Sequence, residues 1–88
     1  MYKLRLSVSG FTKAQIEEGL PHLLDEFGYR PWILESQAFF DETTENLITI
    51  VGYEDDIRLE DRAFDEISDC IFATMNFDEK INIDIQRI

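Results

Sequence analysis

The sequence predicts an α+β fold in which a four-stranded antiparallel sheet, with strand order 4-1-3-2, carries two helices on one face. Three observations lead to this fold. In the stretch from Tyr2 to Val8, apolar and polar residues alternate as in a half-buried strand. A matching alternation recurs near the other terminus, in residues 80–87. The segments between them read helix, strand, strand, helix. The 88 residues suffice for one modest core, so we expect a single domain over residues 1–88.

The first helix is predicted to begin after Thr12 and to end near Gly28. Thr12 suits the N-cap position, and Gln15, three residues on, completes a capping box. Apolar residues then recur at helical spacing as far as Phe27, and a glycine is a natural stop. Pro21 removes one backbone hydrogen bond from the interior of this segment. We therefore expect a kink or a break near this proline.

A β-hairpin is predicted next. Its first strand spans about Trp32 to Phe40 and its second Leu47 to Val51, with the polar segment 41–46 as the connection.

A second helix should begin between Asp56 and Glu60 and end near Asn76. It has an apolar stripe at helical spacing, made of Ala63, Phe64, Ile67, Cys70, Ile71 and Met75. With the last strand, the order of elements is βαββαβ. Right-handed crossovers then give the ferredoxin-like arrangement. Because this fold carries many unrelated functions, it predicts no activity by itself.

Charge is the bulk property that departs most from the ordinary. The chain has 19 acidic and 8 basic residues, a net charge of −11, and most of the acids lie in residues 35–79. Phosphate binding needs clustered Lys and Arg, so we expect no direct binding to nucleic acid. The same repulsion opposes an anionic membrane surface, and no apolar run is long enough to span a bilayer. A basic protein is the partner that this charge favours.

The sequence offers little catalytic chemistry. His22 is the sole histidine, and no nucleophile stands near it in the sequence. Cys70 falls on the apolar stripe among acids, which predicts a buried and inert thiol. The loop 41–46 is rich in oxygen ligands but lacks the spacing of a calcium-binding loop. We therefore expect no catalytic residue, no metal and no cofactor, and the sequence leans against an enzyme without deciding the question.

A row of acids on the second helix is the first candidate site. Asp61, Asp65 and Asp69 recur at i, i+4 and i+8, which brings like charges together at a cost to helix stability. Acids arranged in this way can be presented to a basic partner. The opposing interpretation is a solvated helix face without a partner.

The sheet face away from the helices is the second candidate site. If Ile48 and Ile50 point at the helices, the two hairpin strands would turn four apolar residues to the opposite face. These residues are Ile33, Phe39, Leu47 and Val51. Such a surface is too apolar to leave in water, so we expect it to be buried against a second copy or another protein, and we predict self-association as a homodimer.

The leading functional hypothesis is a small, acidic, non-enzymatic protein-interaction module, inhibitor- or immunity-like, that binds a basic partner. The alternative is a small dimeric ligand-binding protein or enzyme with a cavity beside the sheet. Trp32, Tyr53 and His22 would supply polar atoms to that cavity. The N-terminal segment alternates instead of forming an apolar run, so we expect no signal peptide and a cytoplasmic protein.

Overall fold

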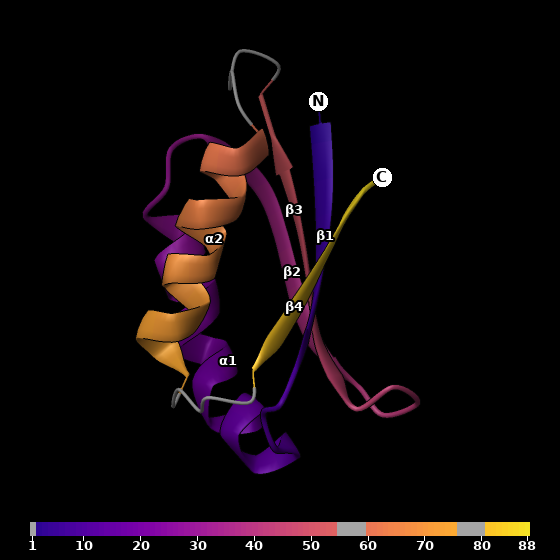
Figure 1. The fold of residues 1–88 in the computed structure, drawn as a ribbon. Coiled ribbons are helices and arrows are strands. Elements are labelled where there is room, and N and C mark those ends of the chain that lie inside the picture. The colour runs from indigo at the N-terminus through magenta and orange to yellow at the C-terminus, as the bar shows by residue number, and fades with distance from the viewer. Residues whose placement is uncertain (1, 55–59, 76–80) are drawn as a thin grey trace.

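The computed structural model describes residues 2–54, 60–75 and 81–88. Its elements are β1 (Tyr2–Ser9), α1 (Lys13–Gly28), β2 (Ile33–Asp41), β3 (Asn46–Tyr53), α2 (Glu60–Thr74) and β4 (Asn82–Arg87). The four strands form one antiparallel sheet in the order β2-β3-β1-β4, which is the predicted order read from the other edge. Both helices cover one face of this sheet, and no described element covers the other (Figure 1). The predicted fold is confirmed.

β1 is the central strand on which the core is built. Leu4, Leu6 and Val8 are at most 1% exposed and face the helices, while the residues between them face the open side. β3 pairs with β1 on one side and β4 pairs with it on the other. The alternation in the first eight residues therefore defines the two faces of the whole sheet.

α1 is one unbroken helix, although Pro21 lies inside it. Thr12 is the N-cap, and its hydroxyl accepts a hydrogen bond from the Gln15 backbone amide at 3.1 Å. In return, Gln15 Oε1 accepts a hydrogen bond from the Thr12 backbone amide at 2.8 Å. The predicted capping box is confirmed, and the break that we allowed for does not occur. One lost hydrogen bond is tolerated because the helix is held to the sheet by a buried apolar face that includes Ile16 and Leu23.

The register of β3 contradicts the prediction for the sheet faces. Leu47 lies opposite Val8 and Val51 lies opposite Leu4, so both point at the helices and are fully buried in the core. The prediction that they lie on the open face is wrong, and Ile48 and Ile50 lie there instead. β3 is apolar on both faces, and a shift of one residue exchanges the faces, so its own sequence could not fix the register.

β2 also departs from the predicted alternation. A register irregularity lies between Ile33 and Glu35. Ile33 lies opposite Tyr53 and packs against the core, so its predicted place on the open face is wrong as well. The cause is the bulge: its extra residue moves the side chains that precede it to the opposite face of the sheet.

α2 packs its predicted apolar stripe into the core. Ala63, Ile67, Cys70, Ile71 and Met75 are buried, and Phe64 is half-buried. The two helices approach closely at Gly19, which is buried beside Met75 and the Thr74 carbonyl. The predicted helix end at Asn76 lies outside the described residues. Within the described part of the chain, no helix combines the length and hydropathy needed to cross a membrane.

Candidate functional site

The outer surface of the helical layer is the acidic surface that the sequence predicted. Asp65 and Asp69 are exposed on α2, one helical turn apart. The side chain of Asp61, the first acid of the predicted row, lies outside the described residues. A helix turns about 100° per residue, so Asp65 and Asp69 lie on the side of α2 opposite its buried residues Ala63, Ile67 and Ile71. The described part of the row therefore points to solvent.

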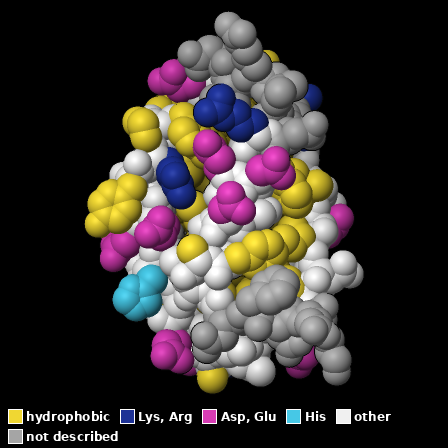
Figure 2. All heavy atoms as spheres, turned by 60° about the vertical axis from the view of Figure 1, so that its left-hand side comes forward, with side chains coloured by type: hydrophobic (Ala, Val, Ile, Leu, Met, Phe, Trp, Pro, Cys, Tyr) yellow, Lys and Arg dark blue, Asp and Glu magenta, His cyan; other side chains and the backbone are white. Residues whose placement is uncertain are grey.

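α1 adds two further acids to this surface. Glu18 and Asp25 are exposed and seven residues apart, which places them on one side of the helix. Among the described residues, no Lys or Arg nitrogen lies within ion-pair distance of Glu18, Asp25, Asp65 or Asp69. We call these four residues the acidic helical layer. Figure 2 shows this side of the molecule, with Asp and Glu side chains in magenta across the helices.

The basic residues of the helices are already paired with other acids. Lys13 Nζ lies 2.8 Å from Glu42 Oε1, and Arg62 Nε lies 3.7 Å from Glu66 Oε1. Arg30, just after α1, has its Nη2 at 3.9 Å from Glu26 Oε2. The described cations of this side therefore do not neutralise the acidic helical layer.

Arg30 also contacts the single cysteine. Its Nη2 donates a hydrogen bond to Cys70 Sγ at 3.4 Å, and this bond raises the pKa of Arg30. Cys70 is 1% exposed, so the predicted buried thiol is confirmed. The sequence interpretation missed Arg30, because the two residues are 40 positions apart and only the fold joins them. The contact ties the end of α1 to α2, and the thiol has no open approach for a substrate.

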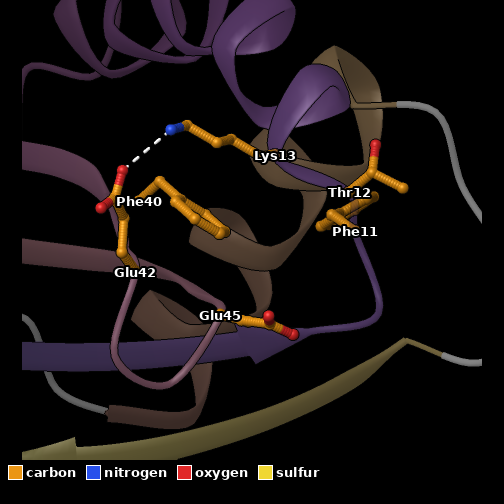
Figure 3. Close-up of a pocket in the computed structure, with 6 residues that line it drawn as sticks. All are labelled: Phe11, Thr12, Lys13, Phe40, Glu42 and Glu45. Atoms are coloured by element: carbon orange, nitrogen blue, oxygen red, sulfur yellow. Dashed lines mark hydrogen bonds and ion pairs between the residues drawn. The ribbon is translucent and has the colours of Figure 1, made fainter.

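An open hollow of about 500 Å³ lies between the start of α1 and the β2–β3 hairpin. It is lined by Phe11, Thr12, Lys13, Phe40, Glu42 and Glu45. Figure 3 shows the Lys13 ammonium directed at the Glu42 carboxylate, with Glu45 on the other side of the hollow. Their hydrogen bond raises the pKa of Lys13 and lowers the pKa of Glu42. Lys13 and Glu42, two of the three charged residues of the hollow, are thus engaged with each other.

The hollow does not match the cavity of the alternative hypothesis. Trp32, Tyr53 and His22 are absent from its lining. Trp32 and Tyr53 do lie together, with ring centroids 6.2 Å apart in an edge-to-face contact, whereas His22 is exposed on α1. The structure therefore brings Trp32 and Tyr53 together in a packing contact and leaves His22 apart from them.

The hairpin loop that was considered for calcium closes on itself. Asp41 Oδ1 accepts a hydrogen bond from the Thr43 amide at 2.9 Å, and this bond lowers the pKa of Asp41. Over the described ranges, no three His, Cys, Asp or Glu side chains come together in a group that could hold a metal ion. The loop geometry is that of a turn held by its own side chain.

The open face of the sheet has a small apolar centre. Phe39 is 37% exposed there, beside the half-buried Ile50 and the buried Ile48. Charged residues border it, including Lys3, whose Nζ lies 3.6 Å from Glu35 Oε2. Of the four residues predicted for self-association, only Phe39 lies on this face. The apolar patch is therefore smaller than predicted. It consists of Phe39, Ile48 and Ile50, of which only Phe39 was predicted to lie there.

Comparisons with known proteins add little to this picture. No family model matches the sequence, and no curated protein matches it. The chain is similar in structure to a formyltetrahydrofolate deformylase from Pseudomonas putida KT2440, with a TM-score of 0.41 and 10% sequence identity. The match covers 98% of this chain and 28% of the length of that protein. A similarity of this size carries no argument about activity.

Proposed function

We propose that this chain is a small, non-enzymatic protein-interaction module whose acidic helical layer binds a basic partner. The observation that carries the proposal is an imbalance on the helical side. Four exposed acids lack a described cation within ion-pair distance, while the described cations nearby are paired with other acids. A basic surface could therefore bind here without first displacing an internal ion pair.

The spacing of the acids supports their acting together. Asp65 and Asp69 are separated by a rise of about 6 Å along the helix, less than the screening length of about 10 Å at moderate salt. A basic partner would therefore experience their combined field. Such complementary charge chiefly speeds association and makes it depend on salt.

The experiment that tests this proposal compares two variants of equal charge. The immobilised chain captures proteins from a lysate of its own organism at low salt, and a reproducibly captured protein is then purified. Its affinity is measured by calorimetry for the wild type, for Asp65→Asn/Asp69→Asn and for the control Glu35→Gln/Glu45→Gln. The control removes two exposed acids that belong to β2 and to the β2–β3 loop and not to either helix.

We expect the helix variant to bind about tenfold more weakly and the control to bind like the wild type. Equal affinity of all three proteins, or equal loss in both variants, would show that the helical acids serve only to keep the chain in solution. In that case the proposed function should be abandoned.

We also propose that the chain is cytoplasmic and that it forms a homodimer through its open face. The dimer proposal now depends on Phe39 and its neighbour Ile50, two apolar side chains that are partly exposed on that face. Its test is given with the predictions below.

A further inference from the structure

The open face of the sheet differs from the helical side in its charge. Its described side chains include two bases and three acids, which nearly balance; they are Lys3, Arg5, Glu35, Asp41 and Asp84. The described side chains of α1 and α2 include seven acids and only two bases. In a chain of net charge −11, the open face is therefore the one of these two sides on which two copies can meet with little repulsion.

One row of the open face has a base on one side of β3 and an acid on the other. Lys3 of β1 and Glu35 of β2 both lie opposite Gly52 of β3, and Lys3 Nζ lies 3.6 Å from Glu35 Oε2. A rotation of 180° about an axis that runs over β3 and parallel to it exchanges the places of the base and the acid. Two copies related in this way would put each Lys3 over the Glu35 of the other copy, in a cluster of four charges of alternating sign.

The next row of the same face supports this arrangement. Arg5 of β1 and Gln37 of β2 both lie opposite Ile50, so the same rotation puts Arg5 over the Gln37 of the other copy. Arg5 Nε is buried and lacks a hydrogen-bond partner within the described part of the chain. An unpaired buried donor is unfavourable, and the side-chain oxygen of Gln37 would offer an acceptor. Ile50 lies on the axis and would pack against the Ile50 of the other copy.

Other two-fold axes bring these charges together less well. With the axis over β1, Lys3 and Arg5 would each face their own counterpart, and like charges repel. With an axis perpendicular to the strands, each strand would face its own counterpart, so the bases of β1 would not meet the acids of β2 and β4. The charges therefore favour the axis over β3.

We propose that a second copy of this chain covers the open face, related to the first by a two-fold axis over β3. This inference rests on the homodimer of the proposed function and specifies its surface, its axis and its ion pairs. Phe39 would cover Ser7 of the other copy, because both residues lie opposite Ile48. Asp41, the last residue of β2, and Asp84, on the edge strand β4, would lie toward the border of the interface, where water reaches them.

The proposed dimer leaves the acidic helical layer free. The helices lie on the side of each sheet away from the interface (Figure 1). The dimer would therefore carry two acidic helical layers that face outward in opposite directions, which suits two basic partners or two basic sites of a larger one. Each layer belongs to one chain, so separating the copies leaves the affinity of a single site unchanged. Glu35→Gln/Glu45→Gln thus remains a control for the affinity of a partner with one basic site.

The first test measures the dissociation constant of the dimer by analytical ultracentrifugation. Lys3→Glu is compared with Arg62→Glu, which changes the net charge by the same amount on the helical side. We expect Lys3→Glu to weaken the dimer at least about tenfold and Arg62→Glu to weaken it less than about twofold. Lys3→Glu/Glu35→Lys restores the alternating charges and should recover most of the affinity. An equal loss in both single variants, or no recovery in the double variant, would overturn the proposed ion pairs.

The second test locates the axis without changing the proposed contacts. A spin label is attached to Gln86→Cys on β4, and the labelled chain is mixed with isotope-labelled wild type for NMR. The native Cys70 is 1% exposed, so we expect it to take no label. Rotation about β3 brings β4 of one copy next to β2 of the other. We therefore expect broadening of the β2 amides around Gln37, and broadening centred on β4 or on the helices would contradict the axis.

The outcomes separate this inference from the rest of the proposed function. A dimeric wild type with a different axis, or without the pairs of Lys3 and Glu35 between copies, contradicts this inference alone. A monomeric wild type ends the dimer proposal and this inference together and leaves the open face to a different protein. Neither result bears on the acidic helical layer, which is tested by the partner affinity of Asp65→Asn/Asp69→Asn.

Discussion

Replacing Gly19 by alanine should destabilise this protein, although alanine is the better helix former. In most helix interiors this change gains up to about 1 kcal/mol. Here the new Cβ would lie 2.9 Å from the Thr74 carbonyl oxygen and 2.9 Å from Met75 Cε, and closer still to Met75 Sδ. The methionine side chain can turn away, but the carbonyl moves only if α2 moves.

The magnitude follows from these two opposing effects. Overpacking of a close contact costs about 1–3 kcal/mol, and a contact with backbone belongs at the upper end of that range. Subtracting the helix gain leaves a net loss of about 1–2 kcal/mol in the free energy of unfolding. For a domain of this size, each 1 kcal/mol corresponds to about 4–8 °C in the melting temperature.

Gly28→Ala is the matched control in the same helix. Gly28 is the last residue of α1, and an added Cβ would meet nothing within 4 Å. We expect this variant to gain about 0.5 kcal/mol in the free energy of unfolding. Both variants are measured by urea denaturation followed by circular dichroism. A Gly19→Ala protein as stable as the wild type, or more stable, would show that the helices do not approach each other at this point.

Three further predictions concern the core, one ion pair and the open face. Leu6→Ala should lose about 2–5 kcal/mol in the free energy of unfolding, because Leu6 is fully buried on the central strand. Leu6→Asp should unfold the domain for the same reason. An unchanged melting temperature in both variants would contradict the place of Leu6 in the core. The lowered pKa of Glu42 means that its pair with Lys13 stabilises the fold above the ordinary glutamate pKa and loses this effect as the pH falls through the lowered value. NMR titration should show the Glu42 midpoint rising in Lys13→Ala, and an unchanged midpoint would refute the pairing. Finally, light scattering should give a homodimer for the wild type and a monomer for Phe39→Lys, and a monomeric wild type would end the dimer proposal.

The fold could be predicted where local patterns have one solution. The alternation of β1 has apolar residues on a single face, and the capping box at Thr12 fixes the start of α1. The sequence of β3 does not show which of its faces points at the helices. Leu47 and Ile48 are both apolar and both buried, one on each face of the sheet. Its facing is decided by pairing with β1, and long-range pairing is not written in the strand itself.

The candidate site was predicted to the extent that it follows helical spacing. The exposure of Asp65 and Asp69 agrees with their place opposite the apolar stripe of α2. The contacts of Arg30 with Cys70 and of Lys13 with Glu42 join residues 40 and 29 positions apart. The place of β4 at the end of the described strand order likewise depends on long-range pairing. These features result from the tertiary fold, so no local sequence pattern predicts them.

The most direct test of the central claim is the salt dependence of the association rate with the captured partner. Rates are measured from about 0.05 M to about 0.5 M salt for the wild type, for Asp65→Asn/Asp69→Asn and for Glu35→Gln/Glu45→Gln. If the acidic helical layer meets the partner, the association rate of the wild type falls steeply with salt. The slope should be clearly shallower for the helix variant and unchanged for the control, with little effect on dissociation. The same slope for all three proteins would contradict the account.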